Sequence, residues 1–503
     1  MAGLEDISSS LQQGENVTVA LRDLNILLEA NDTPLYIQTV LASVPLTLVF
    51  GYLQSGPPAQ IGLACNVLEK LLSKMPATEL VKISTYIELG LQFTDPAIKR
   101  ACLVALDANC NKITPTITAP TMFHLITQIL GDESLECAKL ASKILLQFLS
   151  HPAQLPTPVK DALMIDLSGI MLVSSTVRYR VYELGVMAIV NGNSESFELI
   201  SASGLLTGLL KELEHNDILA QLNCVELLLE LLECPEGVSF LEGQGVMEKL
   251  HTLLIKAQQD PFGEAILPGL IKFFGHVAMS STDVLSLVRG YPHFLPLVLQ
   301  ALPTPHDSTL WGIAVDTFAL LASKPNSRVV LLEQSANTKE CIKALGSFII
   351  NGPTEVRIRS LEAVSQILSC PEQVDSEESV GWKWFSMLGP KLFSALMSLV
   401  KQPFPVIRHS ALKVFLAMAD HEWGQKIMNS NGGFLEFLLD RSTESDKLGR
   451  ELKYEIVCVM AASSCAESVW GNVDLLKLKK YEKEGAFYAL AQSEVIVATD
   501  GSA

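Results

Sequence analysis

The sequence predicts an all-helical protein built from stacked repeats, and three observations lead to this prediction. The chain has 503 residues, which is too long for a single compact core. A short apolar phrase recurs along it at intervals of about 40–50 residues, the period of armadillo and HEAT repeats. Runs that alternate between apolar and polar residues, as strands do, are scarce. We therefore expect an all-α, armadillo/HEAT-like solenoid with a right-handed superhelix of about ten irregular repeats.

The recurring phrase has an apolar residue, often Arg or Lys next, and a small residue one helical turn on. Turn-forming residues such as Asp95-Pro96 and Asn216-Asp217 precede it. Because Asp and Asn cap helix starts and Pro fits the first turn, each copy should begin a helix. Clear copies start at Ile98, Val177, Val356 and Ile407, and weaker copies start near Ile61, Leu135, Ile218, Leu267 and Leu310.

A second phrase begins with glycine and continues with apolar residues at helical spacing. It starts at Gly204, Gly245 and Gly433. Glycine allows a tight turn between consecutive helices, so each copy should begin a middle helix of an armadillo-like repeat.

Breaks in the pattern fall at residues 151–158, 303–305 and 371–379, which are rich in proline or in acidic and serine residues. None has the composition of a long interdomain linker. We therefore predict one continuous solenoid over residues 1–490 and a disordered tail at 491–503. A lysine-rich stretch, Lys477-Leu478-Lys479-Lys480, precedes this weakly patterned end.

Residues 33–68 contain no charged side chain, and residues 35–53 alone are long enough to suggest a membrane span. Pro45 lies in the middle of this segment, however, and polar residues interrupt it. Two short buried helices broken at Pro45 explain it better, so we expect no membrane association.

Charge and cysteine usage exclude several classes of partner and site. The net charge of −18 disfavours nucleic acid and anionic lipid as partners. The 10 cysteines are scattered without zinc-ligand spacing. We interpret them as small core residues in a reducing compartment. The examples within apolar helical phrases are Cys102, Cys137, Cys224 and Cys458.

Catalytic signatures are absent from the sequence. It contains no phosphate-binding loop, dinucleotide fingerprint, zinc-protease motif or nucleophile elbow, and its 9 histidines are dispersed. We therefore predict that the protein is not an enzyme and uses no cofactor or metal. An enzyme with an unfamiliar site is the third possible class, and nothing in the sequence supports it.

The phrase helices also suggest a binding surface. In armadillo repeats such helices line the concave groove, and positions three and six after the first apolar residue should point into it. Three of the four residues at the sixth position are acidic, so we expect a charged, net-acidic groove. A solvated face without partners is an equal alternative. The candidate protein-binding residues are Arg180, Glu183, Asp316, Arg359, Glu362 and Lys413.

The stretch Val177–Leu184, Val-Arg-Tyr-Arg-Val-Tyr-Glu-Leu, is the densest polar and aromatic patch of the sequence. Two interpretations are open. Its arginines and tyrosines can pair and pack at the junction of neighbouring repeats, or Arg180 and Glu183 can present one face to a partner.

Several stretches together resemble one known family. They are residues 177–184, 260–262 with 267–275, 312–317, 402–405 with 411–415, and 440–442. These stretches resemble the regulatory subunit 5 family of non-ATPase subunits of the 26S proteasome, whose members are chaperones of base assembly. The resemblance extends from Val177 to Tyr488, whereas the first third of the chain is similar mostly in its pattern.

The resemblance implies a solenoid without enzymatic activity that binds the C-terminal domain of a proteasomal ATPase subunit. It also implies modules with a second ATPase and a further non-ATPase subunit, and release before the mature particle forms. We expect a chain that is monomeric by itself and cytoplasmic, with the nucleus as a second location left open. The alternative is a generic armadillo-type adaptor or scaffold in transport or signalling. The tryptophans form no ladder with asparagines on successive helices, which counts against an import receptor.

Overall fold

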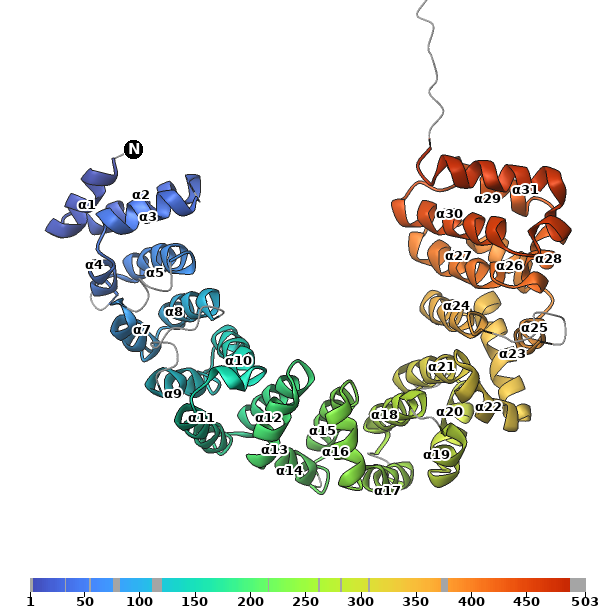
Figure 1. Ribbon diagram of the computed structural model, residues 1–503, viewed down its shortest axis with the longest axis horizontal. Helices are drawn as coiled ribbons and strands as arrows, with labels where there is room; N and C mark the ends of the chain where they lie inside the picture. Colours follow the sequence, from blue (N-terminus) through green and yellow to red (C-terminus); the bar gives the residue numbers. More distant parts are fainter. Residues whose placement is uncertain are drawn as a thin grey trace, which may run out of the picture. The chain divides into compact units, whose positions relative to one another are not determined.

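The computed structural model describes residues 3–31, 33–53, 56–75, 82–110, 120–215, 217–260, 263–280, 283–305, 308–371 and 379–488. Every regular element in these ranges is a helix, which confirms the predicted all-α class (Figure 1). The chain divides into two compact units, residues 1–247 and residues 248–503. The predicted tail at 491–503 and most of the predicted loop at 371–379 lie outside the described residues.

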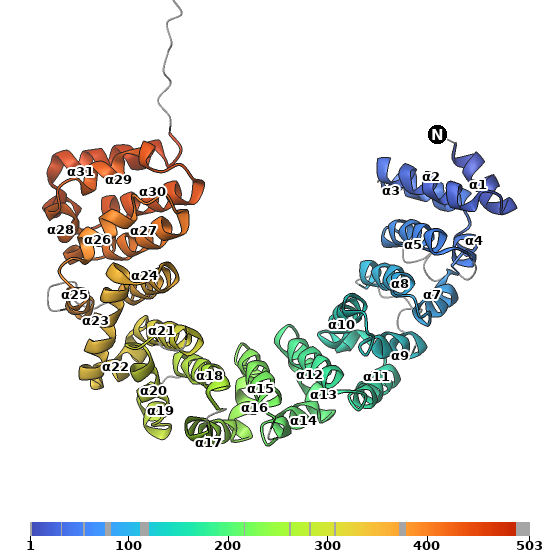
Figure 2. The same cartoon turned by 180° about the vertical axis from the view of Figure 1, so that it is seen from behind.

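Unit 1 consists of a row of long helices packed side by side and a second layer of mostly shorter helices (Figures 1 and 2). The row contains α2 (Val17–Ala30), α5 (Pro58–Ser73), α8 (Pro96–Asn109), α10 (Leu135–Leu149), α12 (Ser175–Val190) and α15 (Ile218–Leu231). The other elements are α1 (Leu4–Gln13), α3 (Pro34–Ser43), α4 (Leu46–Gly51), α7 (Ser84–Leu91), α9 (Pro120–Ile129), η1 (Pro152–Gln154), α11 (Thr157–Ile170), α13 (Ser194–Ala202), α14 (Leu205–Glu212) and α16 (Pro235–Gly243).

Unit 2 repeats this architecture with a second row of long helices. The row contains α18 (Leu267–Ser280), α21 (Ser308–Ala322), α24 (Thr354–Leu368), α27 (Pro405–Ala419) and α30 (Lys447–Ala462), and each member packs against the next. The other elements are α17 (Val246–Gln259), which begins at the boundary between the units, η2 (Gly263–Ala265), α19 (Val284–Gly290), α20 (Phe294–Ala301), α22 (Pro325–Glu333), α23 (Ser335–Asn351), α25 (Val380–Met387), α26 (Leu392–Leu399), α28 (Glu422–Ser430), α29 (Phe434–Leu439), η3 (Arg441–Thr443) and α31 (Ala466–Glu484).

The repeats are of two kinds. After α8 and after α10 a single described α-helix, α9 and α11 respectively, precedes the next long helix, which is the arrangement of HEAT repeats. From α12 to α27 two α-helices follow each long helix, as α13 and α14 follow α12. The glycine phrase, where it occurs, begins the second of these two helices.

The recurring phrase marks the starts of the long helices. All nine predicted copies lie in the first turns of consecutive members of the two rows, from α5 to α27. Predicted caps are present as well: the Asp95 carboxylate accepts a hydrogen bond from the Ala97 N–H at 2.9 Å, and Asp217 does the same for Leu219. These acceptors satisfy N–H groups that a helix start leaves unpaired.

The three glycines of the second phrase have a left-handed backbone. Gly204, Gly245 and Gly433 have φ values of 80°, 61° and 87°, and each immediately precedes a helix. Because side chains are strained in this region, the glycines are required for the tight turn. The prediction from the glycine phrase is confirmed.

The uncharged segment at residues 33–68 forms three helices rather than one. Helices α3 and α4 are separated at Val44 and Pro45, as predicted, and α5 follows after a further break. Among the described residues no single helix combines the length and apolarity needed to cross a membrane, although α30 and α31, bent by 120° at their junction, meet these criteria as a pair.

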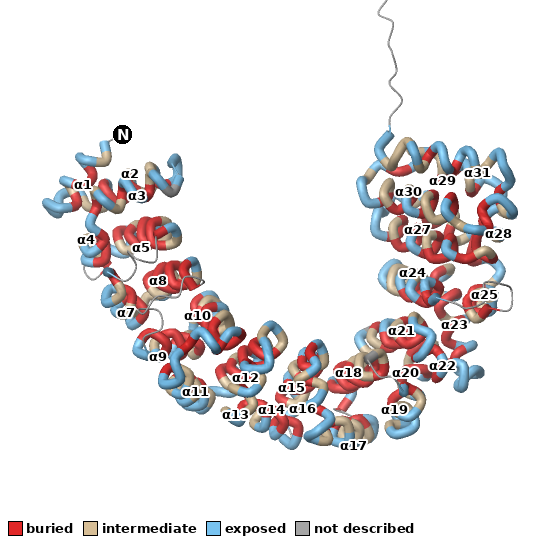
Figure 3. The backbone as a smooth tube through the Cα atoms, viewed as in Figure 1, coloured by how far each residue is buried: buried red, intermediate tan, exposed pale blue. Residues whose placement is uncertain are grey.

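The core of each unit lies between its row of long helices and its second layer (Figure 3). Leucine, alanine and valine dominate it, and phenylalanines such as Phe123 and Phe148 fill the larger spaces, with their rings edge to face at 5.0 Å. In unit 2 the rings of Phe393, Phe415 and Phe434 are in mutual contact across three helices.

Candidate protein-binding surface

The six candidate residues all lie on helices of the two long-helix rows, but in two separate sets. Arg180 and Glu183 lie on α12 in unit 1. The other four lie in unit 2: Asp316 on α21, Arg359 and Glu362 on α24, and Lys413 on α27. Glu183, Asp316, Glu362 and Lys413 are exposed, whereas Arg180 and Arg359 are half-buried.

The unit 2 set forms a row of charges across three adjacent helices. Asp316 and Arg359 form an ion pair of 3.7 Å between α21 and α24. The Arg359 guanidinium lies over Gly312, where a Cβ atom would be 1.8 Å from its Nη1, so glycine at this position makes room for it. The exposed charges therefore alternate in sign along the row, from Asp316 through Arg359 and Glu362 to Lys413.

The pKa of the Asp316 carboxyl group depends on the neighbouring charges of this row. Partial burial raises its pKa, the Arg359 charge opposes the rise, and the Glu362 charge adds to it. The pKa of Asp316 lies above its ordinary value as a result. A partner that brings a positive charge to Asp316 and Glu362 would relieve this repulsion.

The unit 1 set is divided between packing and solvent. Arg180 donates a hydrogen bond of 2.6 Å from Nη1 to the carbonyl oxygen of Leu130, directly after α9. This bond closes the C-terminal end of that helix, so Arg180 supports the contact between repeats. Glu183 is exposed and forms no ion pair with the described part of the chain.

The polar and aromatic residues of the stretch Val177–Leu184 are otherwise engaged in repeat packing. Arg178 forms an ion pair of 2.9 Å with the buried Glu212 on α14. The Tyr179 hydroxyl donates a hydrogen bond of 2.5 Å to the carbonyl oxygen of Ala220 on α15. Tyr182 is buried beside Gly208. The structural interpretation of the stretch therefore accounts for all its polar side chains except Glu183.

Sequence reasoning missed a ladder of ion pairs that joins neighbouring long helices of unit 1. Acids and bases about one repeat apart in sequence meet across the junctions of α2 with α5, α5 with α8 and α8 with α10. The signal was available as opposite charges at equivalent positions of consecutive repeats. The pairs are Lys70 with Glu29 at 2.8 Å, Arg100 with Glu69 at 2.7 Å and with Glu136 at 3.0 Å, and Lys143 with Asp107 at 2.7 Å.

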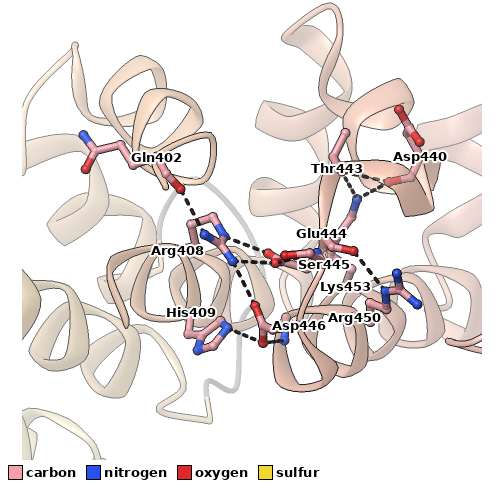
Figure 4. A network of polar contacts seen from close by, with 11 residues as sticks. Gln402, Arg408, His409, Asp440, Thr443, Glu444, Ser445, Asp446, Arg450 and Lys453 are labelled. Atoms are coloured by element: carbon pink, nitrogen blue, oxygen red, sulfur yellow. Dashed lines mark hydrogen bonds and ion pairs between the residues drawn. The ribbon is translucent and has the colours of Figure 1, made fainter. Parts of the chain in front are cut away.

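A buried polar network joins α27 and α30 in unit 2 (Figure 4). Arg408 binds both carboxylate oxygens of Glu444, with distances of 3.0 Å from Nε and 2.6 Å from Nη2, and contacts Asp446 at 2.9 Å. Asp446 in turn lies 2.8 Å from Nε2 of His409. Since Arg408 and Glu444 are almost completely buried, these residues connect two repeats and are not available to a partner.

The same region contains a buried lysine (Figure 4). Lys453 is 1% exposed, and its ammonium group donates hydrogen bonds to the carbonyl oxygens of Phe437 and Asp440 and to Oγ1 of Thr443, at 2.6–2.7 Å. Burial lowers its pKa to about 8. The three acceptors lie around the end of α29, so Lys453 closes that helix as Arg180 closes α9.

No metal-ligand group of three or more His, Cys, Asp or Glu side chains occurs in the described ranges. All ten cysteines are free, and all but the half-buried Cys458 are buried. Burial raises the pKa of Cys102 to about 12. The prediction of core cysteines is confirmed for Cys102, Cys137 and Cys224, while Cys458 lies at the edge of the core.

Comparison with known proteins identifies the family. The family model described as "Proteasome non-ATPase 26S subunit" matches residues 2–503. The chain belongs to this family. The resemblance stated from the sequence is therefore confirmed.

Several curated proteins of the family are similar over nearly their whole length, and all carry the name 26S proteasome non-ATPase regulatory subunit 5. The protein from Homo sapiens is 31% identical over 462 residues, which cover 91% of each chain. The protein from Mus musculus is 32% identical over 89% of each chain. That from Drosophila melanogaster is 25% identical over 88% of this chain and 85% of its own.

Among solved structures, a chain of the complex of Kap95p with RanGDP has the same fold. It matches 95% of this chain and 61% of its own length with a TM-score of 0.54 and 13% identity. This likeness confirms the HEAT-like helical solenoid fold of the chain.

Proposed function

We propose that the chain is a non-enzymatic chaperone for assembly of the base of the 26S proteasome regulatory particle. In this role it binds the C-terminal domain of a proteasomal ATPase subunit, in a module with a second ATPase and a further non-ATPase subunit. It leaves before the mature particle forms and acts in the cytoplasm. The observation that supports the proposal most strongly is the match to proteasome non-ATPase subunits over residues 2–503.

The architecture fits a binding role of this kind. A solenoid exposes one long face of its helix rows, and such faces bind large partner domains. In unit 2 that face has exposed charges on three successive helices, where Asp316, Glu362 and Lys413 lie. We propose that residues 1–490 form one continuous solenoid and that five of the six candidate residues line its partner surface. The sixth, Arg180, supports that surface through its hydrogen bond to the carbonyl oxygen of Leu130.

Affinity capture tests the assembly role. The tagged chain should capture free proteasomal ATPase modules from cell extract and little of the assembled, capped proteasome. Capture of mature particles at full stoichiometry would make the chain a permanent subunit. Capture of cargo without any proteasomal subunit would favour the adaptor alternative instead.

Charge reversal tests the surface. Glu183→Lys combined with Glu362→Lys changes two exposed acids, so the melting temperature should change by no more than a surface substitution normally causes. Binding to the ATPase module should weaken, because truncating or reversing a central contact costs about 1–3 kcal/mol.

A matched control keeps the same change in net charge. Glu242→Lys with Glu340→Lys reverses two exposed acids on α16 and α23, outside the long-helix rows. If both double variants bind as tightly as the parent, the candidate surface is only solvated. If both weaken equally, binding follows the net charge of the chain and not this surface.

A further inference from the structure

The last elements of unit 2 enclose a cavity that lies apart from the candidate surface. It has a volume of about 500 Å³ and lies between α31 and the segment that joins α29 to η3. Its basic and aromatic lining residues are Arg441, Lys477, Lys480, Tyr481 and Tyr488. The lysines belong to the lysine-rich stretch of the sequence, to which the proposed function assigns no role.

Arg441 is held rigidly at the base of this cavity. Its guanidinium stacks on the ring of Tyr481 at 3.7 Å and forms an ion pair of 3.2 Å with Glu484. It also donates hydrogen bonds to the carbonyl oxygens of Tyr481 and Gly485, at 3.3 Å and 3.0 Å. A positive charge fixed in this way loses little side-chain freedom when an anion binds nearby.

The two lysines provide a mobile positive charge at the opening. Their side chains are 57% and 77% exposed for Lys477 and Lys480. Both lysines form ion pairs, Lys477 with Asp474 in the preceding turn at 2.7 Å and Lys480 with Glu484 at 3.8 Å. The Lys480 pair is too long for a hydrogen bond, and Glu484 also pairs with Arg441 at 3.2 Å, so the Lys480 ammonium group can donate hydrogen bonds to another acceptor.

The cavity is less acidic than the chain as a whole. Three bases, Arg441, Lys477 and Lys480, lie among three acids, the lining Asp440 and Glu484 and the Asp474 that pairs with Lys477, whereas the chain carries a net charge of −18. The Asp440 carboxylate accepts hydrogen bonds from the N–H and hydroxyl of Ser442 and is thereby occupied. An acidic ligand is therefore repelled less here than by the chain as a whole, and it finds cationic donors in the lining.

The remaining walls are apolar and aromatic. Leu439 and the rings of Tyr481 and Tyr488 line the cavity beside the cationic groups, and Tyr488 is half exposed. A ligand that fits both walls carries a carboxylate next to an apolar side chain. Peptide segments with acidic and aliphatic residues in alternation have this chemistry, whereas nucleic acid carries no aliphatic side chain for the apolar wall.

We propose that this cavity, the C-terminal pocket, binds an acidic peptide segment of a protein partner. Carboxylates of the segment pair with Lys477 and Lys480, and a neighbouring aliphatic side chain packs on Leu439 and Tyr488. The proposal goes beyond the proposed function, because it concerns a second site outside the row of charges on α21, α24 and α27. Its test involves no proteasomal subunit.

Fluorescence anisotropy with a labelled eight-residue peptide of alternating Glu and Leu tests the pocket on the full chain. We expect a dissociation constant of about 10–100 μM, weakening as salt increases. Replacing each Glu of the peptide by Gln should abolish binding. Lys477→Glu combined with Lys480→Glu should weaken it by about tenfold or more, since a charge pair becomes a repulsion.

The matched control is Lys479→Glu combined with Lys483→Glu, which changes the same charge on the same helix at exposed residues outside the pocket. It should change binding by about twofold or less, since separated surface charges are screened. Equal losses in both double variants would refute the pocket, because the lysines would then act only as general charge near the end of α31. Failure of the Glu-Leu peptide to bind, or displacement by single-stranded nucleic acid or anionic vesicles at equal charge, would also refute the proposal.

Discussion

Breaking the Arg408–Glu444 pair should destabilise the junction between α27 and α30 far more than breaking an exposed pair on the same row of helices. Glu444 is 3% exposed and Arg408 is 8% exposed, so neither charge is compensated by water. Arg408→Met leaves the Glu444 carboxylate buried, with the Ser445 N–H as its remaining hydrogen-bond donor in the described part of the chain. Removing one member of a buried ion pair costs about 3–5 kcal/mol, and we expect a loss in that range.

The matched control is the exposed pair of Arg359 and Asp316. These side chains are 42% and 55% exposed and their charged atoms are 3.7 Å apart. Pairs of this kind contribute about 0–1 kcal/mol, so Arg359→Met should change stability by no more than that.

Hydrogen exchange of the backbone amides of α27 and α30 is the appropriate assay, because it reports the local opening of these two helices separately from the rest of the chain. The double variant Arg408→Met with Glu444→Met should recover most of the loss, since apolar side chains of similar size replace a buried pair at little cost. The reasoning is refuted if Arg408→Met loses less than about 1 kcal/mol, or if the losses of the two single variants simply add in the double variant.

Three further outcomes follow from the same structure. Lys453→Met should destabilise unit 2 by about 3 kcal/mol at pH 7, because three acceptors lose their donor. The pKa of Lys453 in the folded protein, about 8, lies below its ordinary value of 10.5, so the unfolded chain binds more protons between these values. The free energy of unfolding of the parent should therefore rise by about 1 kcal/mol between pH 7 and pH 9 in denaturant titrations, and that of the variant should not. Asp446→Asn should be less stable than the parent at pH 7 but equally stable in acid. Burial alone raises the Asp446 pKa, yet hydrogen bonds from the Gly449 N–H and from His409 hold this pKa below its ordinary value. The Asp446 carboxylate therefore stabilises the fold above about pH 4, and this stabilisation disappears as the pH falls further. Gly346→Ala should lower the melting temperature, because its Cβ would lie 1.8 Å from the carbonyl oxygen of Leu388.

The starts of the long helices were predictable because the signals are local. Asp95 and Asp217 cap their own helices within a few residues, and the glycine at 204 adopts the left-handed turn that its position required. Such features depend on the chain near them and on little else. They were enough to locate nine long helices in order.

The residues that join the repeats could not be assigned in the same way. Arg180 was expected to face a partner from its place in the helical period, yet its guanidinium reaches the carbonyl oxygen of Leu130, 50 residues earlier. A long flexible side chain can turn from one face to another, which periodicity does not describe. Glu183, one turn further on α12, is short and remains in solvent as its position indicated. The roles of the exposed charges depend on the surface of a partner, and the sequence of this chain does not describe that surface.

The ladder of ion pairs in unit 1 makes its repeats non-interchangeable. Arg100 on α8 lies between Glu69 on α5 and Glu136 on α10, so acid, base and acid alternate across three consecutive repeats. Excising the middle repeat and rejoining the chain would bring two carboxylates to the same junction, where they repel. Each repeat therefore specifies which neighbours it accepts, and repeat deletions or duplications in this unit alter the charge match even where the apolar packing is retained.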